Sequence, residues 1–134
     1  MKYMLDTNMC IYLIKNKPES VLLNLREKIH EGVIISAITL AELEYGVEAS
    51  AFPEKNAIAL NQFLSILDIL PFDDRAAVEY GKIYAVLKKK GNLTGKMDAL
   101  IAAHARSAGL VVVTNNTREF ERIEGLRIEN WVKI

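Results

Sequence analysis

The 134-residue sequence has little of several things that would define its class. It has one cysteine, Cys10, which excludes an internal disulfide and a zinc site built from several cysteines. No apolar run approaches the roughly 18 residues of a membrane span, and no signal-peptide core precedes Asp6, so we expect a cytoplasmic protein. A Cys/His ligand set, a Ser-His-Asp set, a Walker loop and a Gly-x-Gly-x-x-Gly string are also missing. These absences argue against acyl transfer and against nucleotide-cofactor binding.

The composition is that of one globular domain, which we expect to span residues 1–134. Apolar residues make up 51% of the chain and charged residues 25%, and the formal net charge is zero. The charge is unevenly distributed along the sequence. Residues 1–80 carry 7 Lys and Arg against 12 Asp and Glu, whereas residues 81–134 carry 10 against 5. The basic second half permits a polyanionic partner, because a protein that binds a polyanion needs a local basic surface rather than a positive net charge of the whole chain.

The hydrophobic pattern predicts short buried strands that alternate with helices. The expected strands are residues 2–5, 33–36, 69–72, 110–113 and 127–129. The expected helices are residues 9–15, 19–30, 39–49, 54–67, 73–90, 97–108 and 118–122. This order predicts an α/β fold with a mostly parallel sheet covered on both faces. The stretch between the second and third strands is too long for one crossover helix, so we expect a projecting helix pair there.

Acidic residues fall at positions that should share one edge of this sheet. Asp6 directly follows the first strand, and Glu42 and Asp98 lie in the expected first turns of two helices. Ligands of open α/β sheets bind at the carboxyl ends of the strands, where the helices also begin. Carboxylates gathered there repel one another unless protons or cations intervene, and Mg²⁺ or Mn²⁺ suits such oxygen ligands. The sequence therefore favours metal-assisted phosphodiester chemistry.

Each of these acids also has a local structural explanation. Asp6 is a good N-cap for the helix that follows, and Asp98 favours the dipole of its helix. Glu42 could serve only as the reciprocal member of a capping box with Thr39. Capping does not require a shared edge, however, so the joint placement of the three acids supports the functional interpretation.

Other polar residues near this edge are candidates for supporting or substrate-binding roles. Asn115 and Asn116 follow the fourth strand and are also good turn residues. Arg106, Arg118 and Arg122 are candidate phosphate ligands, and Thr7, Asn8 and Thr114 are candidate turn or supporting groups. His104 is expected to be a packed histidine rather than a base. The run of lysines at 88–90 is expected to be a solvated helix end, with RNA contact as the alternative.

Four segments together resemble the PIN-domain ribonucleases, and most of all the VapC toxins of bacterial type II toxin–antitoxin systems. They are MLDTN at residues 4–8, AELEYG at 41–46, MDALIAAHAR at 97–106 and TNNTREF at 114–120. The similarity extends to GLR at 125–127 and ENW at 129–131, so that it covers essentially the whole chain. Four motifs in this order make the resemblance specific.

The resemblance implies a three-layer α/β/α sandwich and Mg²⁺-dependent cleavage of structured RNA, with Mn²⁺ as a substitute. The substrate of such toxins is commonly transfer RNA or a ribosomal RNA loop, and its cleavage halts translation. Asp6, Glu42 and Asp98 match the three acidic metal ligands of the family. The implied partners are a second copy of the chain, a VapB-type antitoxin that occupies the active-site groove, and operator DNA bound by the complex.

The sequence departs from the family pattern at Asn116, where many relatives carry an aspartate. An amide offers a neutral oxygen but no charge, which leaves the number of metal ions open. We expect Asn116 to be the fourth catalytic residue, one that orients the metal ion or a water. Glu119 either compensates in part for the missing acid or pairs with a nearby arginine. Two alternative functions remain at this point: a PIN-like RNA-binding or regulatory module that does not cleave, and a housekeeping RNA-processing nuclease.

Overall fold

Five short parallel strands form one sheet in the computed structural model, which describes residues 1–133. The predicted domain ends one residue further on, at Ile134, which lies outside the described residues. In the order of their pairing, β3-β2-β1-β4-β5, the strands are Asp68–Leu70, Val33–Ser36, Tyr3–Leu5, Val111–Val113 and Ile128–Glu129. The predicted parallel α/β fold is confirmed, and the sheet is parallel throughout.

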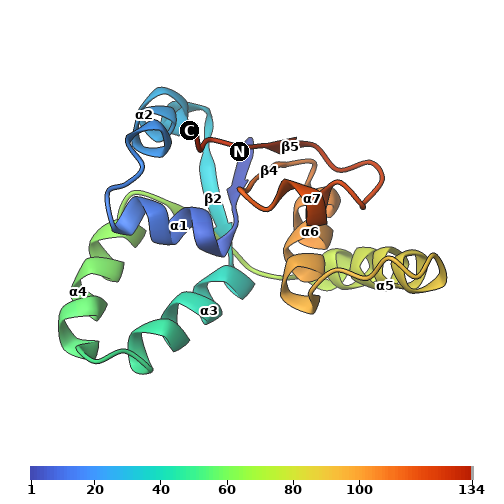
Figure 1. Ribbon diagram of the computed structural model, residues 1–134, viewed down its shortest axis with the longest axis horizontal. Coiled ribbons are helices and arrows are strands. Elements are labelled where there is room, and N and C mark those ends of the chain that lie inside the picture. Colours follow the sequence, from blue (N-terminus) through green and yellow to red (C-terminus); the bar gives the residue numbers. More distant parts are fainter. Residues whose placement is uncertain (134) are drawn as a thin grey trace.

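Helices cover both faces of this sheet (Figure 1). On one side are α1 (Thr7–Ile14), α2 (Glu19–Lys28) with a short 3₁₀ turn (Ile29–Glu31), α3 (Ala37–Glu48) and α4 (Pro53–Leu64). On the other are α5 (Asp74–Lys89), α6 (Lys96–Ala108) and the short α7 (Thr117–Phe120). As predicted, α3 and α4 form a helix pair that projects from the sheet between β2 and β3.

The alternation of side chains along the strands divides the core in two. In β1, Tyr3 and Leu5 face the cluster that includes α1, α2 and α4, and Met4 faces the cluster of α5, α6 and α7. The C-terminal segment closes the first cluster, where the buried Trp131 packs edge-on against Tyr3 with ring centroids 5.6 Å apart. The two clusters fix the sheet between the helical layers, and so they fix the edge at which its strands end.

The boundaries of the elements differ from the predictions by a few residues. The helix predicted for 54–67 ends at Leu64, and the strand predicted for 69–72 is Asp68–Leu70. Two predicted ends hold as expected: Asp73 caps α5 by accepting a hydrogen bond from Ala76 N, and Gly109 ends α6 in the left-handed conformation. Among the described residues, no helix combines the length and the apolar character that a membrane crossing requires.

The predicted capping box of Thr39 and Glu42 is wrong. Helix α3 begins two residues earlier, at Ala37, and Ser36 is its N-cap, with Ser36 Oγ accepting a hydrogen bond from Ile38 N at 3.0 Å. Ser36 Oγ also lies 2.8 Å from Nδ1 of the buried His104, so a tertiary contact fixes the start of this helix. Glu42 consequently lies in the second turn of α3, not the first, and its side chain is free for other contacts.

Candidate active site

The register of β1 and β4 brings Asp6 beside Thr114. Leu5 pairs with Val113, and Asp6 N donates to Val113 O at 3.0 Å, so the next residue of each strand lies at the same edge. Thr114 Oγ1 donates to Asp6 Oδ2 at 2.5 Å, while Asp6 Oδ1 accepts from Met9 N at 2.9 Å. Asp6 is therefore both the predicted N-cap of α1 and a buried carboxylate held in one orientation at the sheet edge.

Helix α3 brings Glu42 to the same edge through the neighbour of Asp6. Thr7 Oγ1 donates to Glu42 Oε1 at 2.6 Å across 35 residues of sequence. Because Thr7 is the first residue of α1 and directly follows Asp6, this bond places the two acids in adjacent positions. The prediction that Glu42 reaches the edge was correct, although the local reason given for its helix position was not.

The other side of the edge is formed by the start of α6 and the turn before α7. Asp98 lies in the first turn of α6, and its Oδ2 accepts a hydrogen bond from Asn116 Nδ2 at 3.2 Å. Glu119 Oε2 accepts from the backbone N–H of Gly95, the N-cap residue of α6, at 3.2 Å. The amide that replaces an acid at position 116 thus contacts one carboxylate directly, and a second acid lies beside it.

The electrostatics of the site link these acids. Burial, together with the charges of Asp6, Glu119 and Glu42, raises the pKa of Asp98 from its ordinary value of 3.8 to about 6, although the hydrogen bond from Asn116 opposes the shift. Burial also raises the pKa of Asp6, with a contribution from Glu42, although the hydrogen bonds from Thr114 and Met9 oppose the shift. Uncompensated carboxylates thus face one another at this edge, which is the condition under which a cation is bound.

The donor set fits a hard divalent cation. Within residues 1–133, no group of three or more Asp, Glu, His or Cys side chains lies in an arrangement that could hold a metal ion. Mg²⁺ does not require three protein ligands, because it usually keeps several waters and uses one or two carboxylates together with substrate phosphates. The oxygens of Asp6 and Asp98, with Glu42 beside them, therefore suit this ion, whereas the chemistry of the site offers no sulfur or imidazole ligand.

Some predicted residues lie at the edge without contacting the acids. Asn8 is exposed on the first turn of α1. Asn115 is also exposed, its Nδ2 lies 3.5 Å from the Tyr12 hydroxyl, and its Oδ1 accepts from Asn130 Nδ2 at 3.2 Å. Sequence reasoning assigned no role at the edge to Tyr12 or to Asn130, although Asn130 belongs to the ENW segment, because only the packing of the C-terminal segment brings them together.

The arginines proposed as phosphate ligands lie in different places in the structure. Arg106 lies near the far end of α6, where it is bound to Glu79 at 2.6 Å and to Glu124 O at 2.9 Å, so it does not reach the edge. Arg122 donates to Leu93 O at 2.8 Å. Arg118 is exposed on α7, next to Glu119. His104 is packed as predicted, and burial lowers its pKa.

A largely apolar groove of about 410 Å³ opens next to Glu42. It is bounded by α1, α3 and α4, with Leu43, Val47 and Leu60 among its lining residues. Gly46 also lines it, and a Cβ added there would meet no atom within 4 Å. The helix pair was expected from the sequence, but this groove was not.

Comparison with known proteins identifies the family. The model of the PIN domain matches residues 3–126. The chain is 51% identical over 132 residues to a protein of Shigella flexneri named tRNA(fMet)-specific endonuclease VapC, with 98% of both chains covered. It is 52% identical over 134 residues to a protein of the same name from Salmonella typhimurium, again with 98% of both covered.

Solved structures give the same answer. A DNA-bound VapBC structure from Salmonella typhimurium superposes with a TM-score of 0.94 at 51% identity, covering 98% of this chain and 99% of the other. VapBC2 of Rickettsia felis, bound to a DNA fragment from its promoter, also gives 0.94, at 43% identity, with 98% and 100% covered. PIN-domain nucleases depend on metal ions. The predicted family is confirmed: the chain belongs to the PIN-domain family, and within it to the VapC toxin ribonucleases.

Proposed function

We propose that this chain hydrolyses phosphodiester bonds of transfer RNA with Mg²⁺ bound by Asp6, Glu42 and Asp98, and that Mn²⁺ can substitute. One observation carries the proposal. Hydrogen bonds from Thr114, Thr7 and Asn116 hold three carboxylates from distant segments at one sheet edge. Carboxylates held close together repel one another unless a cation lies near them. A divalent cation is also what supports phosphoryl transfer.

The side chains divide the work of such a site. The Thr114 hydroxyl fixes the orientation of Asp6, and the Thr7 hydroxyl fixes that of Glu42, so neither carboxylate has to be ordered when the substrate arrives. Asn116 donates to Asp98, and Glu119 adds a negative charge near Asp98. Glu119 also pairs with an arginine, since its Oε1 lies 4.0 Å from Arg122 Nη1, so both predicted roles apply to it. A bound divalent ion supplies a more acidic water for in-line attack and compensates the charge on the phosphoryl oxygens.

The names of the relatives indicate the substrate. Two proteins about half identical over their full lengths are named as endonucleases specific for tRNA(fMet). We therefore assign initiator transfer RNA as the substrate of this chain, with arrest of translation as the consequence. This proposal narrows the expected substrate, which was transfer RNA or ribosomal RNA, to one transfer RNA. We also infer that the protein acts in the cytoplasm, where this substrate is found.

The groove next to Glu42 suits the antitoxin. Its apolar lining fits the hydrophobic face of a peptide helix. A VapB-type antitoxin docked here would block the site without any change in the fold of residues 1–134, the single nuclease domain that we infer.

The solved structures of the relatives support a proposal about the assembly. Both structures are VapBC complexes bound to DNA, one of them to a promoter fragment. We infer that this chain forms a homodimer, that it binds a VapB-type antitoxin, and that the complex binds its own operator.

The test of the proposal is cleavage of a defined RNA by purified protein. Transcribed initiator transfer RNA is incubated with the wild-type chain and Mg²⁺, and the ends of the products are sequenced. Asp6→Asn is expected to reduce cleavage by at least about 10³-fold, because it removes a charge that no neighbour can replace. Asp68→Asn is the matched control, since it makes the same chemical change in an exposed residue of β3 and should leave activity unchanged.

Two outcomes would contradict the proposal. The first is cleavage that persists in excess chelator. The second is firm RNA binding without cleavage by wild-type protein, which would instead support the RNA-binding module considered as an alternative.

A further inference from the structure

The connection between α5 and α6 runs alongside the segment that contains α7, and three contacts join them in order. Lys90 Nζ lies 3.4 Å from Glu124 Oε1. Arg122 Nη1 donates to Leu93 O at 2.8 Å, and Gly95 N donates to Glu119 Oε2 at 3.2 Å. Residues 90, 93 and 95 thus contact residues 124, 122 and 119, respectively. Because the numbers rise in one segment and fall in the other, the two segments lie antiparallel to each other. Residues 90–95 therefore form a tethered track rather than a free loop.

This track leads to the acidic edge. It begins at the end of α5 and ends at Gly95, next to Glu119 and three residues before Asp98. Its five residue steps span at most roughly 18 Å. In Figure 1 this connection runs beside α5 back to the start of α6.

Free cations accompany the track from one end to the other. Lys88, Lys89, Lys96 and Arg118 are exposed, and within the described part of the chain none of them forms an ion pair. Lys90 and Arg122, by contrast, are engaged in holding the track together. Four positive charges are thus available at the surface, two at the far end and two beside the acids.

We propose that this surface, made by Lys88, Lys89, Lys96 and Arg118 along residues 90–95, binds the phosphate backbone of the RNA and guides it to the acidic edge. The inference rests on the proposed function and names the side from which the substrate enters. Lys96 and Arg118 contact phosphates next to the bond that is cleaved, and Lys88 and Lys89 contact phosphates further along the strand.

Charge complementarity favours RNA on this surface and disfavours RNA on the other side of the acidic edge, which is formed by α3 and α4. Helix α3 carries Glu42, Glu44 and Glu48 and no basic residue, so it repels a polyanion. The groove beside it is largely apolar, which suits a peptide. The two walls of the edge therefore differ in partner, with nucleic acid on the side of α6 and α7 and protein on the side of α3 and α4.

The test measures RNA affinity against salt. Binding of fluorescein-labelled initiator transfer RNA is followed by anisotropy over a KCl series, with Asp6→Asn present in every chain to prevent cleavage. Each lost phosphate contact lowers the slope of log K against log salt by about 1, so Lys88→Ala with Lys89→Ala should lower it by about 2. The affinity at 0.15 M salt should fall on the order of tenfold.

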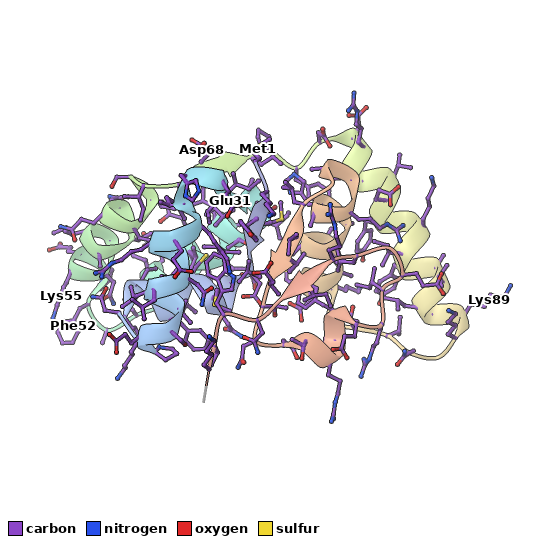
Figure 2. All side chains as sticks on the ribbon, turned by 90° about the horizontal axis from the view of Figure 1, so that it is seen from above. Met1, Glu31, Phe52, Lys55, Asp68 and Lys89 are labelled. Carbon is purple, nitrogen blue, oxygen red and sulfur yellow. The ribbon has the colours of Figure 1, made fainter. Side chains whose placement is uncertain are left out.

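The matched control replaces two exposed lysines that lie away from the track. Lys17→Ala with Lys55→Ala makes the same change in net charge, and Figure 2 shows Lys55 and Lys89 at opposite ends of the molecule. This control should keep the slope of the parent. With Asp6 restored, the Lys88 and Lys89 double variant should show a raised KM with kcat unchanged, because neither lysine lies at the acids.

The outcomes separate this inference from the proposed function. The inference would be contradicted if the slope of log K against log salt were unchanged in the Lys88 and Lys89 variant, or if it fell equally in the control. This holds whatever the cleavage result. Loss of antitoxin binding with RNA binding intact would also overturn it, because the surface would then be a protein interface. A lowered slope in a protein that never cleaves RNA would uphold the track and refute the proposed function.

Discussion

Thr7 and Glu42, separated by 35 residues, are joined by a 2.6 Å hydrogen bond from a hydroxyl to a carboxylate. The bond connects the first turn of α1, which Asp6 caps, to the projecting helix α3. The orientation of Glu42 therefore depends on how α3 packs against α1. Glu42 also lines the groove between these helices, so a ligand in the groove would lie beside this contact.

The raised pKa of Asp98 predicts a pH-dependent stability of the metal-free protein. A carboxyl with a pKa of about 6 in the folded chain and 3.8 ordinarily binds more protons when folded. The free energy of unfolding should therefore fall as the pH rises from about 4 to about 6. Because Asp98 is partly exposed, solvent screening limits the fall to about 1–2 kcal/mol.

Urea unfolding in chelator, measured at several pH values, checks this expectation. Asp98→Asn should remove most of the fall, whereas Asp68→Asn, in an exposed position of β3, should keep it. A remaining slope of the same sign is expected from Asp6, whose pKa burial also raises. Stability that rises over this pH interval would contradict the assignment.

The amide at position 116 predicts a trade between stability and metal affinity. Asn116→Asp replaces a donor to Asp98 with a like charge, so the metal-free protein should lose about 1 kcal/mol of stability. The added carboxylate should in turn strengthen Mg²⁺ binding, and the increase in melting temperature caused by Mg²⁺ should be larger than in the parent. Differential scanning calorimetry with and without Mg²⁺ measures both effects.

Asn115→Asp serves as the control for this change. It makes the same substitution one residue earlier, where the side chain faces Tyr12 and Asn130 instead of the acids. Equal responses of the two variants to Mg²⁺ would show that position 116 has no special relation to the ion.

The sequence predicted the architecture because the three central strands, β2, β1 and β4, are short, buried and well separated along the chain. Val111–Val113 and Val33–Ser36 are β-branched runs with a clear turn or glycine signal beside them, and both were located within a residue. The gathering of Asp6, Glu42 and Asp98 was also predictable, since parallel topology alone places strand ends and helix starts at one edge. The spatial proximity of residues far apart in sequence could thus be predicted from the local sequence pattern and one topological rule.

Side-chain contacts were less predictable. The capping box failed because Ser36 is held by His104, 68 residues away, and local sequence contains no trace of that contact. Arg106 was assigned to the edge by its closeness in sequence to Asp98, but eight helical residues carry it about 12 Å along the axis. The apolar groove is lined by residues of α1, α3 and α4, which are distant in sequence, so it depends on how these helices pack together.

The failed capping box leaves a prediction about Thr39. This residue is fully buried in α3, and its hydroxyl has no hydrogen-bond partner in the described structure. An unsatisfied buried hydroxyl is unfavourable, so Thr39→Val should raise the free energy of unfolding by about 1 kcal/mol. Thr94→Val is the contrasting variant, because the Thr94 hydroxyl donates to Gly95 O at 3.2 Å and its loss should not stabilise. Chemical denaturation compares the two, and destabilisation by Thr39→Val would show that its hydroxyl is bonded after all.

The groove predicts a variant that separates toxicity from neutralisation. Gly46 lines the groove within α3, and a side chain added there meets no protein atom within 4 Å, so Gly46→Met should fold and occupy the space intended for the antitoxin. Replacing a helical glycine should also stabilise the chain by about 0.5–1 kcal/mol. The variant should cleave RNA at the parental rate while its affinity for the antitoxin falls by at least about tenfold, as measured by calorimetry. Gly81→Met is the control, since Gly81 is exposed in α5, equally unobstructed, and remote from the groove. If both variants bind the antitoxin like the parent, the groove is not its docking site.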